Sequence, residues 1–333
     1  MSGKPVTSVD VARKAGVSQS AVSRFFTPGA SVSKKMADKI RVAADELGYR
    51  PNVLARAMIT GKSRIIGLVV YYLENQFYPE AVEKLSIALQ ENGYHVLLFM
   101  ASNTIGDVEP VIQEIMGYRV DGIVMVSVSI SSTLAERCNG LGIPVLLFNR
   151  DQRDDVLRAV TSDNYAGGRM AAELLLRSNP KRIAHLAGFG GASTQIDREA
   201  GFTDALREAG RDLHAREDGN FHYSDAADAT RLLFDVPEPP DALFVSDDHM
   251  ALAAMDVIRH ELNLRIPEDV AVVGFDDIPQ ASWPSFNLTT IRQPINQMVS
   301  AAVGELLGAI EDGNTEVRKI RLPPVPVVRG TTR

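Results

Sequence analysis

The stretch Thr7-Ser-Val-Asp-Val-Ala-Arg-Lys-Ala-Gly-Val-Ser-Gln-Ser-Ala-Val-Ser-Arg24 decides how the first part of this chain folds. Its pattern predicts two short helices joined by a tight turn, with a capping box of Thr7 and Asp10 at the start. Gly16 ends the first helix, and Ser18 caps the second. Small apolar residues face inward, whereas Gln, Ser and Arg face outward. We expect a helix-turn-helix whose second helix suits a DNA major groove.

A third helix completes a small all-α domain over residues 1–50. It is predicted over residues 34–47, where apolar side chains recur at helical spacing. Ser33 is its expected cap, and Gly48 is its expected end. Three short helices around one small core are enough for a domain of this length.

The segment 51–62 is a hinge or linker. Asn52 can cap a short apolar run over residues 53–59, which is too short to be a stable helix by itself. Two interpretations stay open at this point. The run is either a hinge that folds only when a partner holds it, or a plain linker helix packed on the next domain.

Length and composition limit the classes of protein. At 333 residues the chain is long enough for two or three domains, and its hydrophobic content of 45% suits packed globular cores. The single cysteine, Cys138, excludes an internal disulfide and fits a reducing compartment. We find no secretory signal and no apolar run of membrane-spanning length. We therefore expect a cytoplasmic protein with no membrane partner.

Charge is distributed unevenly along the chain. Residues 1–62 hold 11 Lys and Arg against 4 Asp and Glu, whereas the remainder holds 24 basic and 38 acidic residues. A basic module on an acidic body indicates a polyanion partner for the module alone. The plain alternative is a solvated positive face.

From residue 65 onward, short apolar runs alternate with amphipathic helices. This alternation predicts parallel sheets covered by helices on both faces, and seven or more strands indicate two doubly wound lobes. The expected strands cover residues 65–70, 94–99, 122–126, 145–148, 182–186, 242–245 and 270–274. The clearest helices cover residues 78–92, 164–176, 198–209 and 250–262.

The loops that follow these strands carry aromatic and polar side chains. Ligands of parallel α/β sheets bind beyond the carboxyl ends of the strands, so these loops are the place to look for a site. Aromatic rings can stack on the apolar faces of a polyhydroxy ligand, while carboxylates, amides and an arginine form paired hydrogen bonds. The richest loops are 71–78, 127–129, 149–151, 188–194, 219–221, 246–249 and 275–277.

A set of motifs now identifies a family. They are Asp10-Val-Ala-Arg-Lys-Ala-Gly-Val-Ser-Gln-Ser-Ala-Val-Ser-Arg24, Leu47-Gly-Tyr-Arg-Pro-Asn52, Ala55-Arg-Ala-Met58, Val120-Asp-Gly-Ile-Val124, Asp163-Asn-Tyr-Ala-Gly-Gly168, Arg198-Glu-Ala-Gly-Phe202, Asp247-Asp-His-Met-Ala-Leu252, Val273-Gly-Phe-Asp-Asp277 and Leu288-Thr-Thr-Ile291. With these motifs in this order, the chain resembles the LacI/GalR-type (lactose-repressor) transcriptional regulators over nearly its whole length.

The resemblance implies a homodimer that represses transcription by binding a pseudo-palindromic, double-stranded operator. Gln19, Ser20 and Arg24 fall where the family reads bases, and each good pairing gives about 1–3 kcal/mol of discrimination. Positions near backbone contacts and caps are Thr7, Ser18, Ser23 and Asn52. The hinge, with Ala55 and Met58, enters the minor groove, and methionine stands where the family usually has a leucine wedge.

The resemblance also implies a body like a periplasmic sugar-binding protein, with two lobes, three crossovers and a cleft that binds a small-molecule effector. A sugar is favoured, and the neutral Asn149 beside Arg150 favours a sugar acid. The implied body covers residues 63–333, with lobe 1 at about 63–161 and 292–320 and lobe 2 at about 162–291 and 321–333. The implied effector residues are Phe77, Tyr78, Ser127, Asn149, Thr194, Arg198, Phe221, Asp247 and Asp276.

Other chemistries are weighed against these interpretations. The pairs Asp247-Asp248 and Asp276-Asp277 favour loop and helix-cap roles over a metal or acid–base centre, and the histidines lack metal-ligand spacing. The loop 188–191 lacks the glycine spacing of a phosphate site, and no nucleophile-elbow pattern occurs. We therefore expect no cofactor and no catalytic residue. The alternative function is a sugar-processing enzyme or a simple binding protein with an accessory helical module.

Overall fold

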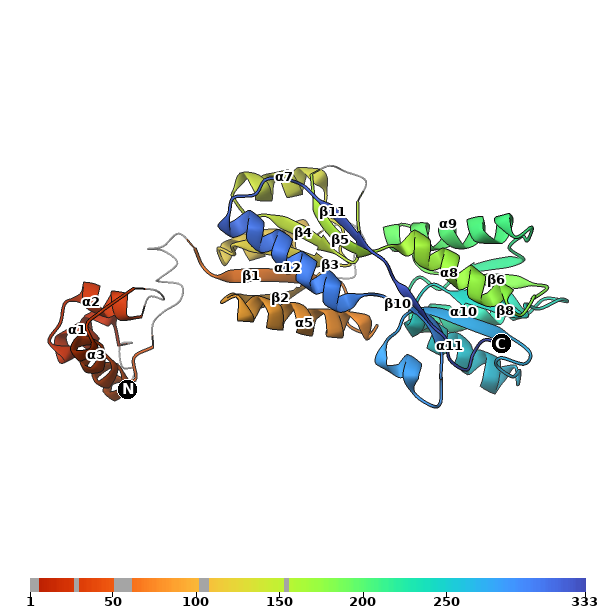
Figure 1. Cartoon of the computed structure of the whole chain (residues 1–333), viewed down its shortest axis with the longest axis horizontal. Coiled ribbons are helices and arrows are strands. Elements are labelled where there is room, and N and C mark those ends of the chain that lie inside the picture. The colour runs from red at the N-terminus through yellow and green to blue at the C-terminus, as the bar shows by residue number, and fades with distance from the viewer. Residues whose placement is uncertain (1–5, 27–29, 51–61, 102–107, 153–155) are drawn as a thin grey trace. The chain divides into compact units, whose positions relative to one another are not determined.

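The computed structural model divides into two compact units, Met1–Arg64 and Ile65–Arg333 (Figure 1). We call them the N-terminal unit and the body, and each is described by itself. None of the described helices is long and apolar enough to cross a membrane. The described residues are 6–26, 30–50, 62–101, 108–152 and 156–333.

The described part of the N-terminal unit contains three helices. Each of them contributes to one small core, in which Val11, Val22 and Ile40 are fully buried. Because this core buries little surface, the ends of the helices matter for its stability. The helices are α1 (Ser8–Ala15), α2 (Gln19–Phe25) and α3 (Lys34–Leu47).

The helix ends agree with the sequence at all but one position. The backbone N–H of Asp10 donates to Thr7 Oγ1 at 3.4 Å, and the N–H of Thr7 donates to the Asp10 carboxylate at 3.0 Å, so the capping box is confirmed. Gly16 ends α1 at φ = 64°, a left-handed conformation that glycine adopts without strain, and Ser18 caps α2. Ser33 occupies the N-cap position of α3 as expected, but its side chain makes no capping hydrogen bond.

The first lobe of the body is built on a sheet of six parallel strands in the order β11-β5-β4-β3-β1-β2. Side chains on alternate faces of β1 pack on α5 and α12 or on α6 and α7. The strands are β1 (Ile65–Val70), β2 (His95–Met100), β3 (Gly122–Val126), β4 (Val145–Phe148), β5 (Arg158–Ser162) and β11 (Lys319–Leu322). The helices are α5 (Phe77–Glu91), α6 (Glu109–Gly117), α7 (Ser132–Gly140) and α12 (Ile295–Glu311).

The second lobe repeats this plan with the strand order β12-β10-β9-β8-β6-β7, in which only β12 is antiparallel. Helices α8 and α9 cover one face, and α10 and α11 cover the other. The strands are β6 (Ile183–Ala187), β7 (Ala215–Asp218), β8 (Ala242–Val245), β9 (Ala271–Asp276), β10 (Thr289–Arg292) and β12 (Val325–Val327). The helices are α8 (Asn164–Leu176), α9 (Ser193–Glu208), α10 (Tyr223–Phe234), α11 (Asp248–Asp256), a π-helix (Val257–Glu261) and a 3-10 turn (Pro279–Ser282).

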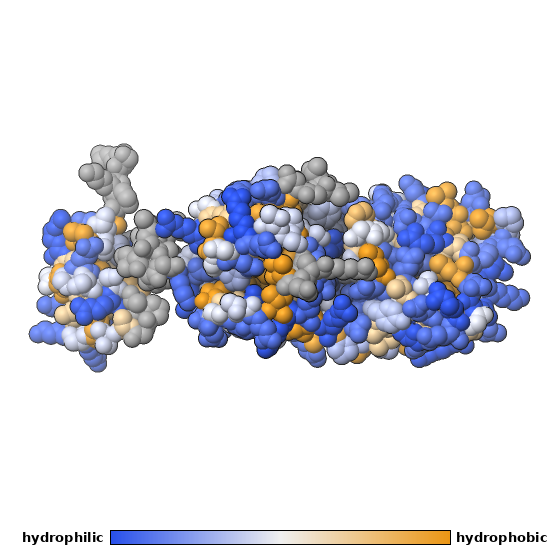
Figure 2. All heavy atoms as spheres, turned by 90° about the horizontal axis from the view of Figure 1, so that it is seen from above, coloured by the Kyte–Doolittle hydropathy of each residue, from blue (hydrophilic) through white to orange (hydrophobic). Residues whose placement is uncertain are grey.

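The chain passes between the lobes three times: from β5 to α8, from β10 to α12, and from β11 to β12 (Figure 1). The third passage falls after Leu322, because β11 pairs with β5 up to that residue. The division expected at residue 320 therefore lies inside a strand. The visible surface of the body is mainly hydrophilic, with apolar side chains in small patches over both lobes (Figure 2).

Several elements differ from the sequence-based expectation. Strands β5, β7, β11 and β12 were missed, since charged residues and proline interrupt their apolar pattern. The helix expected from residue 198 begins at Ser193, because the N–H of Ile196 already bonds to the Ala192 carbonyl. The helix expected to run to residue 262 changes to π geometry, in which the N–H of Leu262 bonds five residues back to Val257.

Candidate functional site

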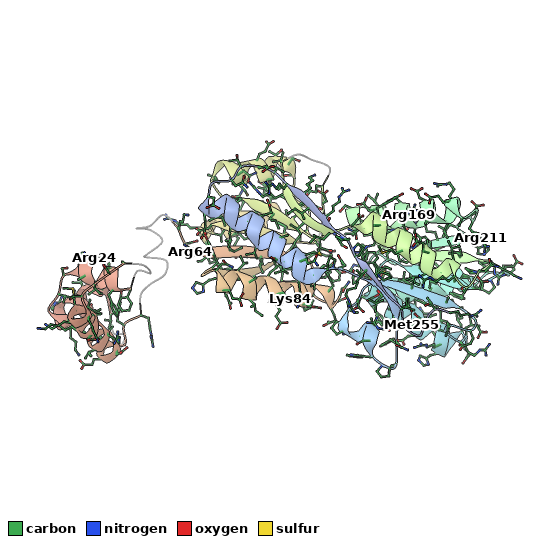
Figure 3. The ribbon with its side chains drawn as sticks, in the orientation of Figure 1. Arg24, Arg64, Lys84, Arg169, Arg211 and Met255 are labelled. Atoms are coloured by element: carbon green, nitrogen blue, oxygen red, sulfur yellow. The ribbon has the colours of Figure 1, made fainter. Side chains whose placement is uncertain are left out.

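The outward face of α2 carries the side chains expected to read DNA. Ala21 and Val22 on its inner face are buried. Gln19 Nε2 donates to Ser8 Oγ at 3.1 Å, and Arg24 Nε donates to the Ser20 carbonyl at 3.4 Å. These exposed, single hydrogen bonds exchange easily with those that base edges offer. The exposed side chains of this segment are Ser18, Gln19, Ser20, Ser23 and Arg24, of which Figure 3 labels Arg24.

Asp10, Asp38 and Glu46, three of the four acidic residues described in the N-terminal unit, form ion pairs with basic residues of α1 or α3. Lys14 and Glu46 approach to 2.6 Å, and Arg41 and Asp38 approach to 3.3 Å. Arg24 takes part in none of the ion pairs formed by the described residues of the unit. A guanidinium that no carboxylate holds, on an exposed helix, suits contact with a phosphate or a guanine.

The hinge residues lie outside the described part of the chain. Asn52, Ala55 and Met58 all fall within 51–61. Their expected contacts with the minor groove therefore stay predictions.

In the body, a cavity of about 820 Å³ opens at the carboxyl ends of strands from both lobes. We call it the cleft cavity. Its size lies within the range of sites that bind small molecules. The first lobe contributes Tyr71, Tyr72, Ser127, Ile130 and Arg150, and the second contributes Phe189, Phe221, His222 and Asp225.

Of the nine residues expected at an effector, Ser127 and Phe221 line the cleft cavity. Two others support Ser127 from behind: Ser127 Oγ donates to Tyr78 Oη at 3.0 Å and accepts from Asn149 Nδ2 at 3.1 Å. The Asn149 Oδ1 atom is buried without a hydrogen-bond donor among the described residues. Thr194 is buried in the first turn of α9 and does not line the cavity.

Backbone geometry and a glycine shape the wall of the cleft cavity near Ser127 and Phe221. Ser127, Asn149 and Phe221 have positive φ angles of 55°, 71° and 66°, which are costly for residues with a Cβ and therefore mark positions that the fold holds in place. A Cβ on Gly188 would overlap the ring of Phe221. Gly188 thus leaves room for the aromatic ring of Phe221.

Tyr72 is a wall residue that sequence reasoning missed. Its ring meets Tyr78 edge-to-face at 5.1 Å and lies 5.9 Å from the ring of His222. Its hydroxyl donates to the carbonyl of Phe221 at 3.4 Å, and therefore joins the two lobes. Burial raises the pKa of Tyr72 well above its ordinary value, so this hydroxyl stays a donor.

Beside the cleft cavity lies a buried polar cluster, which we call the central network: Asn75, Asn164, Arg198, Ser246, Asp247, Asp276 and Gln293. Asn75 Nδ2 from the first lobe donates to Asp247 at 3.1 Å and to Asp276 at 3.3 Å in the second. Gln293 Nε2 donates to Asp276 at 2.7 Å. The three residues Arg198, Asp247 and Asp276, expected to hold an effector, are thus bonded to the chain itself.

Arg198 is the hub of the central network. Its guanidinium donates to Asn164 Oδ1 at 2.9 Å, to the carbonyl of Ser246, and to Asp276 at 3.4 Å. It also lies 3.6 Å from the centre of the Phe275 ring, a cation–π contact. Arginine has enough donors in a fixed plane to hold all of these groups at once.

The two carboxylates of this network have shifted pKa values. Burial raises the pKa of Asp276 to about 7 and that of Asp247 to about 6, even though Arg198 pulls both downward. Asp247 also caps α11 by accepting the N–H of Met250. Within the described residues, no group of His, Cys, Asp and Glu is placed to hold a metal ion.

Behind the network, His185 is fully buried and stacks on Phe244 at 4.9 Å. Burial lowers the pKa of His185 to about 4, so the ring is neutral near pH 7. Gln195 bonds the ring, accepts the hydroxyl of Ser246 and donates to Glu199 at 2.8 Å. This chain of bonds fixes the carbonyl to which Arg198 donates.

Phe77 faces a second, smaller cavity of about 260 Å³ together with Asp276 and Gln293. Asn75 and Gln293 were both missed as site residues. Asn75 lies inside the loop 71–78, in which the aromatic residues were selected, and Gln293 follows the run 288–291. Inspecting every amide in the loops that follow the strands would have found both.

Comparisons with known proteins agree with this arrangement. Residues 8–52 match the family model described as bacterial regulatory proteins, lacI family, and residues 172–332 match a periplasmic binding protein-like domain. The chain is 31% identical to the ribose operon repressor of Halalkalibacterium halodurans over 97% of this chain and 96% of that protein.

Solved structures show the same fold over the whole length. The lac repressor dimer bound to operator and the anti-inducer ONPF is similar at a TM-score of 0.88, with 27% identity over 99% of both chains. A complex of the transcriptional regulator CelR with cellobiose is similar at a TM-score of 0.73, with 29% identity over 98% of this chain and 99% of that one.

These relatives are regulators of transcription and not enzymes, which sets aside the sugar-processing alternative. The small all-α domain and the two-lobed body both have counterparts in them. The chain belongs to the lacI family of bacterial regulatory proteins.

Proposed function

We propose that this protein is a transcriptional repressor that acts in the cytoplasm as a homodimer on a pseudo-palindromic operator. The observation that carries the proposal is the presence, in one chain, of a capped helix-turn-helix with an exposed polar face and of a cavity enclosed by two lobes. One copy of α2 offers few base contacts. A second copy at fixed half-site spacing supplies the rest of the affinity and the specificity.

The reading side chains are Gln19, Ser20 and Arg24. Arg24 pairs with guanine and Gln19 with adenine, since these are the bidentate partners that each side chain matches. The hinge over residues 53–59 folds on the central minor groove, and Met58 supplies the apolar wedge. Thr7, Ser18 and Ser23 contact or orient toward the phosphate backbone.

A small-molecule effector, a sugar or a sugar acid, binds in the cleft cavity and changes how the lobes meet. Support comes from the aromatic wall and from Tyr72 and Asn75, which join the lobes by hydrogen bonds that a ligand can replace. Operator and effector are then linked ligands, with a coupling of about 1–3 kcal/mol.

Selection of binding sites from a randomised duplex pool tests the proposal directly. We expect a two-fold symmetric sequence whose binding constant falls steeply as salt rises. Arg24→Ala should weaken binding to the selected site by about 1–3 kcal/mol and relax the preference at one position of each half-site. Arg211→Ala, which removes a cation from the second lobe (Figure 3), is the matched control and should change neither. Recovery of no preferred sequence would contradict the proposal.

A further inference from the structure

Arg150 is a cation in the wall of the cleft cavity that no carboxylate of the described residues neutralises. It follows β4 and the turn residue Asn149, and its side chain is half-buried. Among the hydrogen bonds and ion pairs of the described residues, none involves its guanidinium. By contrast, the buried guanidinium of Arg198 is bonded to Asn164, Ser246 and Asp276.

The acidic residue next to Arg150 in sequence and the acidic residues that line the same cavity have other partners. Asp151, its neighbour in sequence, pairs with Lys319 at 3.1 Å and Arg321 at 3.6 Å. Glu109 at the cavity pairs with Arg137 at 3.5 Å. Asp225 accepts from Asn220 at 3.2 Å and from the hydroxyl of Ser224.

The surroundings of Arg150 suit an anion that also carries hydroxyls. The guanidinium lies close enough to Tyr72 and Tyr78 to oppose the rise in pKa that burial gives both phenols. The Ser127 hydroxyl lines the same wall, and Asn149 Nδ2 donates to it from behind at 3.1 Å. Neutral polar side chains of the first lobe therefore share this wall with one positive charge.

The region of the cleft cavity around Arg150 carries a positive charge, whereas the central network contains two carboxyl groups. Asp247 and Asp276 would repel an anion, and their oxygens already accept from Asn75, Arg198 and Gln293. Removing a guanidinium from water without a partner is unfavourable, and its planar fork matches a carboxylate or a phosphate in two parallel hydrogen bonds. The acidic group of a ligand thus binds best at the Arg150 end.

We propose that the effector carries a carboxylate or phosphate group that pairs with Arg150 inside the cleft cavity. This inference rests on the effector role proposed above and narrows its chemistry from sugars in general to sugar acids or sugar phosphates. The apolar faces of the sugar then pack on the rings of Phe221 and Tyr71, which line the same cavity.

The test compares matched ligands on the full-length protein by thermal shift and calorimetry. The neutral probes are D-glucose, D-galactose and D-ribose, and the acidic probes are D-glucuronate, D-galacturonate, D-gluconate, glucose 6-phosphate and ribose 5-phosphate. We expect an acid to bind about 10–100-fold more tightly than its neutral parent, which is the value of a charge-assisted pair. Binding of the sugar acids or of the sugar phosphates shows whether the acidic group of the effector is a carboxylate or a phosphate.

Variants then assign the effect to Arg150. Arg150→Gln should lose the advantage of the acid, and Arg150→Lys should retain part of it, since lysine keeps the charge but not the fork. Arg211→Gln, which removes a cation outside the cavity, should bind the acid like the wild type. Binding of a neutral sugar as tightly as its acid, unchanged acid binding in Arg150→Gln, or no binding of any acid would each overturn the inference. Operator binding by the same preparations is measured separately, so failure of the proposed function is distinguishable.

Discussion

Gln19, Ser20 and Arg24 on α2 are chemically the same three side chains as Gln195, Ser246 and Arg198 in the body. The first set is exposed, and the two hydrogen bonds described for Gln19 and Arg24 each join one donor to one acceptor of the same unit. The second set is buried and bonded into a network that reaches His185, Glu199 and Asp276. The same three residue types are therefore available for recognition on α2, whereas in the body they stabilise the fold.

This difference decides what a mutation reports. An exposed polar side chain adds little to the stability of its unit, so its loss changes the affinity for a partner. A buried polar side chain leaves unpaired groups behind when it is removed, so its loss changes stability first. The following experiments test that division, beginning with the largest expected effect.

Arg198→Ala should lower the free energy of unfolding of the body by about 3–5 kcal/mol, because it removes the cation that pairs with the buried Asp276 and the donor to the Ser246 carbonyl. Arg24→Ala should change stability by less than about 0.5 kcal/mol. Urea unfolding followed by the fluorescence of Trp283, the single tryptophan, measures the body, and hydrogen exchange of the α1–α3 amides measures the N-terminal unit. Equal losses of stability in Arg198→Ala and Arg24→Ala would contradict the distinction between buried and exposed polar side chains.

The second experiment follows stability against pH in Asp276→Asn. Burial raises the pKa of Asp276 to about 7 from an ordinary value of 3.8, so the native state holds a proton that the unfolded state releases. The contribution of the protonated Asp276 to the free energy of unfolding is fully present below about pH 4. It is lost as the pH rises to about 7. The amide that replaces the carboxyl group cannot ionise, so the stability of the variant relative to the wild type should increase by a few kcal/mol over this window.

Other groups titrate in the same window, which is why the difference between the two proteins is measured. The pKa of His185 is lowered to about 4, so its contribution decreases as pH falls from about 6.5, opposite to that of Asp276. This contribution is present in both proteins and cancels. A difference that does not vary with pH would mean that Asp276 is ionised throughout.

The third experiment uses glycine contacts between α8 and α9. A Cβ on Gly201 would overlap the carbonyl oxygen of Tyr165, so Gly201→Ala should destabilise the body by at least about 1–3 kcal/mol. Gly304 in α12 has nothing within 4 Å of the same position, and Gly304→Ala should stabilise the body by up to about 1 kcal/mol. Thermal unfolding of both variants checks the sign, and a stable Gly201→Ala protein would contradict this close approach.

The smallest expected effect concerns the caps of the N-terminal unit. Thr7→Ala should lower the opening free energy of the α1 amides by about 1 kcal/mol, because it removes the capping box. Ser33→Ala is the matched control and should leave α3 nearly unchanged, since Ser33 makes no capping bond with its side chain. Hydrogen exchange in the full chain resolves the two helices separately. A larger loss from Ser33→Ala would reverse the assignment of the caps.

The N-terminal unit and the body also differ in how much of their structure the sequence alone predicts. Thr7, Gly16 and Ser18 act on residues a few positions away, so local rules place α1 and α2 and expose Gln19 and Arg24. In the parallel sheets, continuous apolar runs gave the central strands. The edge strands β7 and β12 were missed because their residues are only partly buried.

The cleft depends on contacts that no local rule contains. Asn75 and Asp276 lie 201 positions apart and meet only because two lobes pack together. Ser127 and Phe221 were among the effector residues that the family resemblance implied, and both line the cleft cavity. It did not indicate that Arg198 and Asp276 bond to each other, because satisfaction of a buried polar group depends on every neighbour in three dimensions.

The central claim is that occupancy of the cleft cavity changes affinity for operator DNA. Fluorescence anisotropy of a labelled operator, titrated with the full-length protein with and without the acid that binds at Arg150, measures the coupling. The account predicts a change of about 5–150-fold in operator affinity, and an equal change in acid affinity when operator is bound. An acid that binds the cleft while operator affinity stays the same would contradict it.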